Sequence, residues 1–181
     1  GNIISMVGGV SYNNSNFNRV TQAYRQPGSS IKPFIYAHAL ETKKFLPNTL
    51  ILDSNILLDQ GNNLPVWVPQ NYSNKSYGEL TFRRALETSN NLVTLKIGLD
   101  LGLNSVNEFL DKINFYNKNI KYDVYSTLLG AVENNLLNLA TSYSIFLNGG
   151  YIVEPSIIKK VVSNEGELIV NNEYFKCNYC S

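Results

Sequence analysis

The chain has few of the residues that usually build metal or redox sites. Its 181 residues include one histidine, one tryptophan, one methionine and two cysteines. Cys177 and Cys180 form a Cys-x-x-Cys pair near the C-terminus, far in sequence from the single histidine, His38. A structural zinc site needs four ligands, and a redox pair needs a helix N-terminus that lowers one thiol pKa. The sequence therefore predicts no metal and no cofactor, with the cysteines incidental or joined in a disulfide.

Charge and hydropathy also exclude several classes of partner. Fifteen Lys and Arg residues nearly balance fourteen Asp and Glu residues, for a net charge of +1. The basic residues are scattered, which argues against a nucleic-acid partner. No apolar run approaches the roughly 18 residues of a membrane span, and the chain does not open like a signal peptide. Any membrane attachment is therefore expected only through parts outside this sequence.

The hydrophobic content of 44% is enough for one substantial core. Chains of this length commonly fold as a single domain, so we expect one domain over residues 1–181. The first residue is Gly1 and not Met, which we interpret as the start of a piece cut from a longer protein.

The most informative stretch is residues 25–34, Arg-Gln-Pro-Gly-Ser-Ser-Ile-Lys-Pro-Phe. Pro27 and Gly28 interrupt regular structure, and Ser29 then stands where a helix begins. Ser29 and Lys32 are i and i+3 neighbours on that helix, so they share a face. A serine hydroxyl becomes a good nucleophile when a neighbouring base takes its proton, and a partly desolvated lysine amine can do so. Apolar residues continue the helical spacing at Ile31, Phe34, Ile35, Ala39 and Leu40.

A second Ser-x-x-Lys occurs at Ser156 to Lys159, so the spacing alone is weak evidence. The surrounding run, residues 155–162, is rich in β-branched residues and predicts a strand. In a strand, positions i and i+3 point to opposite faces and cannot cooperate. The pair at Ser29 and Lys32 is therefore the better candidate.

A further motif, Ser-Asn-Asn, lies at Ser89 to Asn91. Ser-x-Asn also occurs at residues 11–13 and 105–107, so its context has to separate the three copies. Residues 89–91 stand between two predicted helices. Either Ser89 or Asn90 could simply cap the second helix, a role that does not exclude catalysis.

The remaining elements are predicted from periodicity and turn signals. Residues 46–78 lack periodicity and predict a long functional loop region. Residues 2–12 predict a strand pair, with a turn at Gly8 and Gly9. Helices are expected from Leu80, over residues 92–101 up to Gly102, from a cap at Asn104, and over residues 135–147; strands are expected at residues 151–154, 157–163 and 167–170.

The block at residues 17–34 closely resembles the active-site segment of class A penicillin-binding proteins. The likeness continues through Trp67-x-Pro69-x-Asn71 and through residues 129–150, and it covers nearly the entire chain. It implies an α+β, β-lactamase/transpeptidase-like fold in which helices pack on an incomplete antiparallel sheet. Trp67 either lines the substrate groove, as the family pattern implies, or only anchors the loop on the core.

The same resemblance assigns roles to the two motifs. Ser29 would be the acylated nucleophile and Lys32 its base. Ser89, which follows Ser29 by 60 positions (89 − 29), would relay a proton between Lys32 and the leaving amine. Asn91 would hydrogen-bond the amide of the substrate.

One family motif is missing. Penicillin-binding proteins complete the site with Lys-Thr-Gly or Lys-Ser-Gly on an edge strand, and this chain has only Lys96-Ile97-Gly98 inside a predicted helix. We therefore expect the N-terminal part of a transpeptidase domain, lacking the C-terminal part that carries that strand and catalytically incomplete alone. Unpaired strands would leave open sheet edges and favour self-association.

The resemblance implies a peptidoglycan D,D-transpeptidase that acts on D-Ala-D-Ala stem peptides, is acylated by β-lactams, and works on the extracytoplasmic (periplasmic) side of the bacterial inner membrane. Two alternatives stay open. A serine β-lactamase uses similar motifs but needs a group that activates the deacylating water, and no Glu is evident in that role. A non-catalytic peptidoglycan-binding or sensor domain would bind stem peptides without being acylated.

Overall fold

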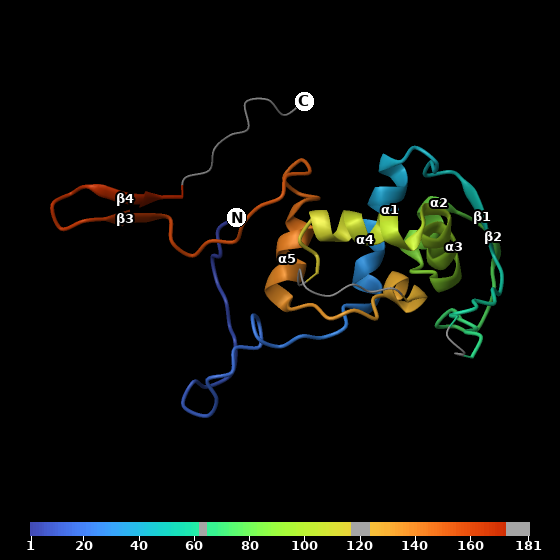
Figure 1. Ribbon diagram of the computed structural model, residues 1–181, viewed down its shortest axis with the longest axis horizontal. Coiled ribbons are helices and arrows are strands. Elements are labelled where there is room, and N and C mark those ends of the chain that lie inside the picture. The colour runs from blue at the N-terminus through green and yellow to red at the C-terminus, as the bar shows by residue number, and fades with distance from the viewer. Residues whose placement is uncertain (62–64, 117–123, 173–181) are drawn as a thin grey trace.

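The computed structural model describes residues 1–61, 65–116 and 124–172, so Cys177 and Cys180 lie outside the described residues. Helices form the body, and the strands form two separate antiparallel pairs (Figure 1). This arrangement confirms the predicted α+β class. The elements in order are η1 (Gly28–Ile31), α1 (Lys32–Glu41), β1 (Leu50–Asp53), β2 (Gly78–Thr81), α2 (Phe82–Glu87), α3 (Asn91–Leu101), α4 (Leu103–Lys112), η2 (Tyr125–Leu129), α5 (Leu136–Ser144), β3 (Lys160–Val162) and β4 (Leu168–Asn171).

The central helix begins as one turn of 3₁₀ helix, η1, and continues as α1. Pro33 stands in the first turn of α1, where its missing N–H costs no hydrogen bond. Phe34, Ile35, Tyr36 and Ala39 of α1 are all buried, because this helix packs against α3, α4 and η2. Phe34 is buried among three aromatic rings, with centroid distances of 5.0 Å to Phe115, 4.9 Å to Tyr143 and 5.1 Å to Phe146.

Side-chain caps fix where the other helices start. Thr81 accepts a hydrogen bond from the Arg84 N–H and starts α2, and Asn90 accepts from the Val93 N–H and starts α3. Asn90 thus caps the helix, as one of the sequence interpretations proposed. Gly102, with φ at 86°, ends α3 as predicted, and it is also the N-cap of α4. The predicted cap at Asn104 is wrong by two residues.

The predicted loop region at residues 46–78 is partly wrong, because it contains β1. This strand pairs antiparallel with β2, from Leu50 opposite Thr81 to Asp53 opposite Gly78, and the pair lies beside α3 (Figure 1). The predicted helix starts at Phe82 and not at Leu80, which belongs to β2. Trp67 packs against the core and pairs with the Leu58 backbone, which fits the anchoring interpretation.

The predicted strand pair at residues 2–12 is wrong. The segment forms a single bridge, between Asn2 and Ser156, and is otherwise irregular. Ile4, Val7 and Val10 are exposed, so no apolar neighbour rewards an extended pairing there. A strand needs a continuous ladder of backbone hydrogen bonds, and the described residues give this stretch only isolated ones, such as Ile3 N–H to the Ser156 carbonyl and Arg19 N–H to the Gly8 carbonyl, both at 2.9 Å.

The C-terminal hairpin of β3 and β4 projects away from the helices (Figure 1). Residues 151–154 are not a strand, and residues 155–159 form a bridge and bends before β3 begins at Lys160, so both strand predictions are wrong in these parts. The hairpin leaves Ile169 and Val162 exposed. No helix in the described ranges is long and apolar enough to cross a membrane.

Candidate active site

The amine of Lys32 lies at the centre of the site. The Lys32 side chain is 1% exposed, although it belongs to the first turn of α1. Its Nζ lies 2.6 Å from the Ser89 carbonyl oxygen, 2.6 Å from Asn91 Oδ1 and 3.0 Å from Ser89 Oγ. The structure thus brings Lys32, Ser89 and Asn91 together, although Ser89 follows Lys32 by 57 positions.

None of these three partners carries a negative charge, so no ion pair offsets the burial of the Lys32 amine. Burial lowers the pKa of Lys32 to about 8, because a charged ammonium is poorly solvated inside the protein. A neutral amine has two N–H groups and one lone pair. Its two N–H groups match the carbonyl oxygens of Ser89 and Asn91, and its lone pair can accept from a hydroxyl; the Ser89 hydroxyl lies 3.0 Å away.

Ser29 lies on η1, one turn before Lys32, and its side chain is exposed. The Lys32 backbone N–H donates to the Ser29 carbonyl, which closes this turn. In a 3₁₀ helix the side chains at i and i+3 are eclipsed, so both lie on one face. The nucleophile candidate is therefore accessible from solvent, while its base candidate is buried behind it.

Contacts with a distant segment hold the turn that carries Ser29. The Gly28 N–H donates to the Gly130 carbonyl over 3.3 Å, and the Tyr143 hydroxyl donates to the Ser30 carbonyl over 2.8 Å. Gly28 and Gly130 both have positive φ, at 54° and 80°. A Cβ added at Gly130 would collide with the Gly28 carbonyl oxygen, so this close approach requires glycine.

The second motif lies in a strained turn between α2 and α3. Ser89 has φ at 52°, a left-handed conformation that is unusual for a residue other than glycine. This conformation directs both the carbonyl and the hydroxyl of Ser89 to the Lys32 amine. Strain of this kind persists where surrounding contacts impose it, and such positions cluster at functional sites.

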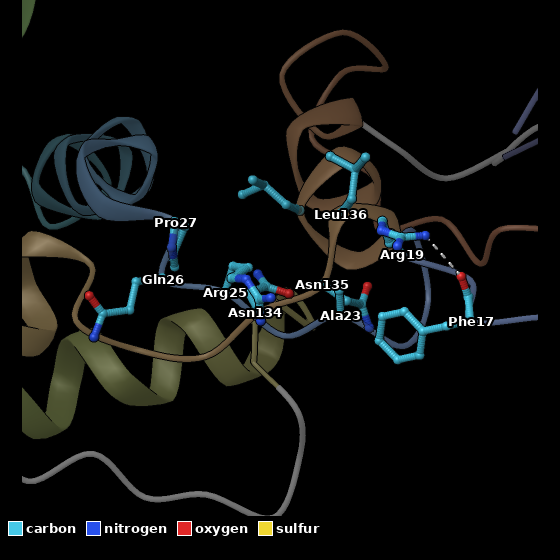
Figure 2. A pocket seen from close by; sticks show the side chains of 10 residues that line it. Phe17, Arg19, Ala23, Arg25, Gln26, Pro27, Asn134, Asn135 and Leu136 are labelled. Atoms are coloured by element: carbon cyan, nitrogen blue, oxygen red, sulfur yellow. Dashed lines mark hydrogen bonds between the residues drawn. The ribbon is translucent and has the colours of Figure 1, made fainter. Parts of the chain in front are cut away.

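Two hollows flank the site. One of about 390 Å³ is lined by Ser89 and Asn90 together with Tyr72, Tyr77 and Arg84. Another of about 620 Å³ lies beside the segment that leads to Ser29, where Arg25 lies next to Asn134, just before the start of α5 (Figure 2). Ser29 lines neither of these two hollows.

The competing pair does not form a comparable site. The Ser156 hydroxyl donates to the Ile158 carbonyl over 2.9 Å, and Lys159 is exposed. Lys96 of the accidental Lys-Ile-Gly lies on α3, as predicted, and donates to the Leu52 carbonyl and the Ser54 hydroxyl.

Comparison with known proteins agrees with this geometry. Residues 1–177 match the family model of the penicillin-binding protein transpeptidase domain. The chain belongs to this transpeptidase family. Penicillin-binding protein 1A of Rickettsia conorii is 37% identical over 181 residues, which are all of this chain and 22% of that protein. Penicillin-binding protein 1A of Neisseria flavescens is 38% identical over 169 residues, 93% of this chain and 21% of that protein.

Solved transpeptidases share the fold. The crystal structure of penicillin-binding protein 1A from Haemophilus influenzae matches with a TM-score of 0.81 and 36% identity, over 91% of this chain and 24% of that one. Penicillin-binding protein A of M. tuberculosis, solved as an imipenem acyl-enzyme complex, matches with a TM-score of 0.69 over 86% of this chain and 40% of that one. At 15% identity that match concerns the fold alone. The β-lactamase/transpeptidase-like fold predicted for this family member is confirmed.

Sequence reasoning missed the residues that hold the site from a distance. Gly130 and Tyr143 contact the turn of Ser29 across more than a hundred positions, and no local pattern marks either one. The buried carboxylate of Asp53 was also missed. Its one signal is a charged residue that directly follows the apolar run of β1.

Replacing Gly130 with alanine tests the close approach to Gly28. Gly130→Ala should destabilise the protein, because the new methyl group meets backbone atoms of Gly28 that cannot easily move. It should also slow penicillin labelling of Ser29, the candidate nucleophile. Gly166→Ala is the matched control, since Gly166 also has positive φ but open space around it. The control should cost about 1 to 2 kcal/mol of unfolding free energy. Equal unfolding free energies and equal rates of penicillin labelling in the two variants would contradict the expectation.

Proposed function

We propose that the protein containing this chain is a peptidoglycan D,D-transpeptidase, with Ser29 as nucleophile and Lys32 as its base. The observation that carries the proposal is the buried Lys32 amine, held by Ser89 and Asn91 one turn from an exposed serine. The pKa of about 8 places a useful fraction of this amine in the neutral, basic form near neutral pH.

In the first step, Ser29 Oγ bonds to the carbonyl carbon of the penultimate D-Ala of a stem peptide. The hydroxyl proton passes to Lys32 Nζ, and the carbonyl oxygen gains negative charge. The exposed position of Ser29 at the start of the central helix supports this role, because helix N–H groups stabilise developing negative charge.

In the second step the peptide bond breaks and the terminal D-Ala leaves as an amine. That amine needs a proton, which Ser89 would pass on from Lys32. The distance of 3.0 Å between Lys32 Nζ and Ser89 Oγ supports this relay. An amine from another stem peptide then attacks the acyl-enzyme and regenerates Ser29, with the proton returning by the same route.

Asn91 has a second role in this proposal, as hydrogen-bond partner of the substrate amide. Its Oδ1 accepts from Lys32, and its Nδ2 donates to the Gln70 carbonyl over 2.9 Å. These two contacts fix the orientation of the side-chain amide. The hollow beside Ser89 gives the substrate peptide room on this side of the site.

The same chemistry makes β-lactams suitable acylating ligands, because their strained amide presents a carbonyl to the same serine. The acyl-enzyme with imipenem in the M. tuberculosis relative supports this proposal by analogy.

The proposed substrates, peptidoglycan stem peptides, lie outside the cytoplasm, so the protein would work on the periplasmic side of the inner membrane. Its membrane contact would come through parts outside this chain.

We further infer that residues 1–181 are the N-terminal part of the transpeptidase domain, without the segment that carries Lys-Thr-Gly. The chain spans about a fifth of the curated relatives it matches. Exposed apolar side chains at Ile4, Val7 and Val10, and on the hairpin of β3 and β4, are consistent with a face that such a segment would cover. Left open, this face would promote self-association.

The nucleophile is tested in the full-length protein. Ser29→Ala should abolish covalent labelling by a penicillin, whereas Ser156→Ala should leave it nearly intact, because Lys159 is exposed and unsuited to act as a base. Intact-mass spectrometry after incubation with the penicillin measures both. Labelling that survives Ser29→Ala would refute the assignment. Rapid hydrolysis of the penicillin would instead favour a β-lactamase.

The isolated chain should be acylated far more slowly than the full-length protein. Loss of one oxyanion-hole donor typically costs about 10²- to 10³-fold in rate. The missing segment would also position the substrate carboxylate, which adds to the loss. Acylation is followed by mass spectrometry, and size-exclusion chromatography reports self-association. A monomer that acylates within tenfold of the full-length rate would show that nothing essential is missing.

A further inference from the structure

A buried carboxylate, that of Asp53, lies next to the Ser89 to Asn91 motif. Asp53, at the end of β1, is 1% exposed, and its carboxylate has no part in the reaction proposed above. It accepts hydrogen bonds from Asn71 Nδ2 at 3.0 and 3.1 Å, from Asn90 Nδ2 at 2.9 Å and from the Tyr77 N–H at 2.8 Å. A buried carboxylate is costly unless its oxygens are satisfied, and these donors satisfy both.

The two asparagines connect Asp53 to the start of α3. Asn71 Oδ1 accepts from the backbone N–H groups of Asn91 and Leu92 at 2.9 and 3.3 Å. Asn90 Oδ1 accepts from the Val93 N–H at 2.9 Å. The first three N–H groups of α3 are therefore satisfied by two amide oxygens, and the NH₂ groups of the same two amides are held by one carboxylate.

This arrangement fixes the directions of both asparagine side chains. An amide presents oxygen on one side and NH₂ on the other, so an acceptor at Asp53 forces both oxygens toward the helix. The helix N-terminus, with its partial positive charge, favours the buried carboxylate in return. The turn before α3 contains Ser89, whose strained backbone brings its oxygens to the Lys32 amine.

We propose that Asp53 is a positioning residue, which acts through Asn71 and Asn90 to hold Ser89 and Asn91 on the Lys32 amine. This inference rests on the proposed function and adds to it a residue that acts on the site only through its neighbours. Asp53 touches neither Lys32 nor Ser29 in the hydrogen bonds that hold it, so its effect on the reaction is indirect.

The test uses the isosteric substitution Asp53→Asn in the full-length protein. The new amide turns a donor toward at least one of the two asparagines, so the network loses a bond without losing volume. With a fluorescent penicillin, the acylation rate constant should fall about 30- to 100-fold, while the non-covalent dissociation constant changes less than threefold. Hydrogen exchange of the peptide covering residues 88–93 should become faster.

A compensating substitution makes the test specific. In the double variant Asp53→Asn/Asn71→Asp, the carboxylate at position 71 can accept from the amide at position 53 and from the N–H groups of Asn91 and Leu92. The amide oxygen at position 53 can still accept from the Tyr77 N–H and from Asn90. Asn71→Asp also removes the 2.8 Å hydrogen bond from Asn71 Nδ2 to the Lys75 carbonyl, so the recovery is partial. The double variant should be acylated about tenfold faster than the single variant and should regain part of the slow exchange of residues 88–93.

Leu110→Ala is the control for simple destabilisation, because Leu110 is a buried apolar residue of α4 outside this network. It should lower the melting temperature but change acylation less than threefold. Unaltered acylation and exchange in Asp53→Asn, a double variant no better than the single one, or an equal loss in Leu110→Ala would each overturn the inference. If the unsubstituted protein is not acylated at all, the proposed function fails. The exchange of residues 88–93 in the single and double variants then decides the inference by itself.

Discussion

The site depends on the burial of one amine among uncharged oxygens. Lys32 is enclosed by the protein, and its Nζ meets the carbonyl and hydroxyl of Ser89 and the amide oxygen of Asn91. Removing an ammonium from water without a counter-ion is unfavourable, so the neutral amine forms more readily than in water and the pKa of Lys32 falls to about 8. A lysine with this pKa is a base near neutral pH. A lysine exposed on the surface would instead keep its proton at this pH.

The surrounding fold serves to keep this amine in place. The central helix α1 supplies the lysine and, through η1, the exposed Ser29, while the start of α3 supplies the oxygens. Each of these two segments is held from outside: η1 by the close backbone approach of Gly130, and the start of α3 by Asn71. The strained backbone of Ser89 fits this view, because an unsupported turn would relax to a more favourable conformation.

The sequence predicted what depends on near neighbours and missed what depends on distant ones. The spacing of Ser29 and Lys32, and of Ser89 and Asn91, is local and can be read at a helix start, but it is weak evidence by itself. The resemblance to penicillin-binding proteins was needed to join the two motifs in one site. Gly130 and Asp53 were not predictable, because their roles come from tertiary contacts that no periodicity records. The strand prediction for residues 2–12 was wrong for a related reason. Residues 2–12 have the composition of a strand, but a strand forms only where a partner accepts its hydrogen bonds.

The most direct test of this account is an NMR titration of the Lys32 side chain in protein labelled at the lysine carbons, with Lys32→Arg to assign the signal. Lys32 should titrate near pH 8, well below the usual pKa of a lysine side chain. Ser89→Ala should shift that midpoint, because it removes a hydroxyl neighbour of the amine. A midpoint above 10 that Ser89→Ala does not change would contradict the claim that burial lowers the pKa of Lys32 enough for it to act as a base near neutral pH.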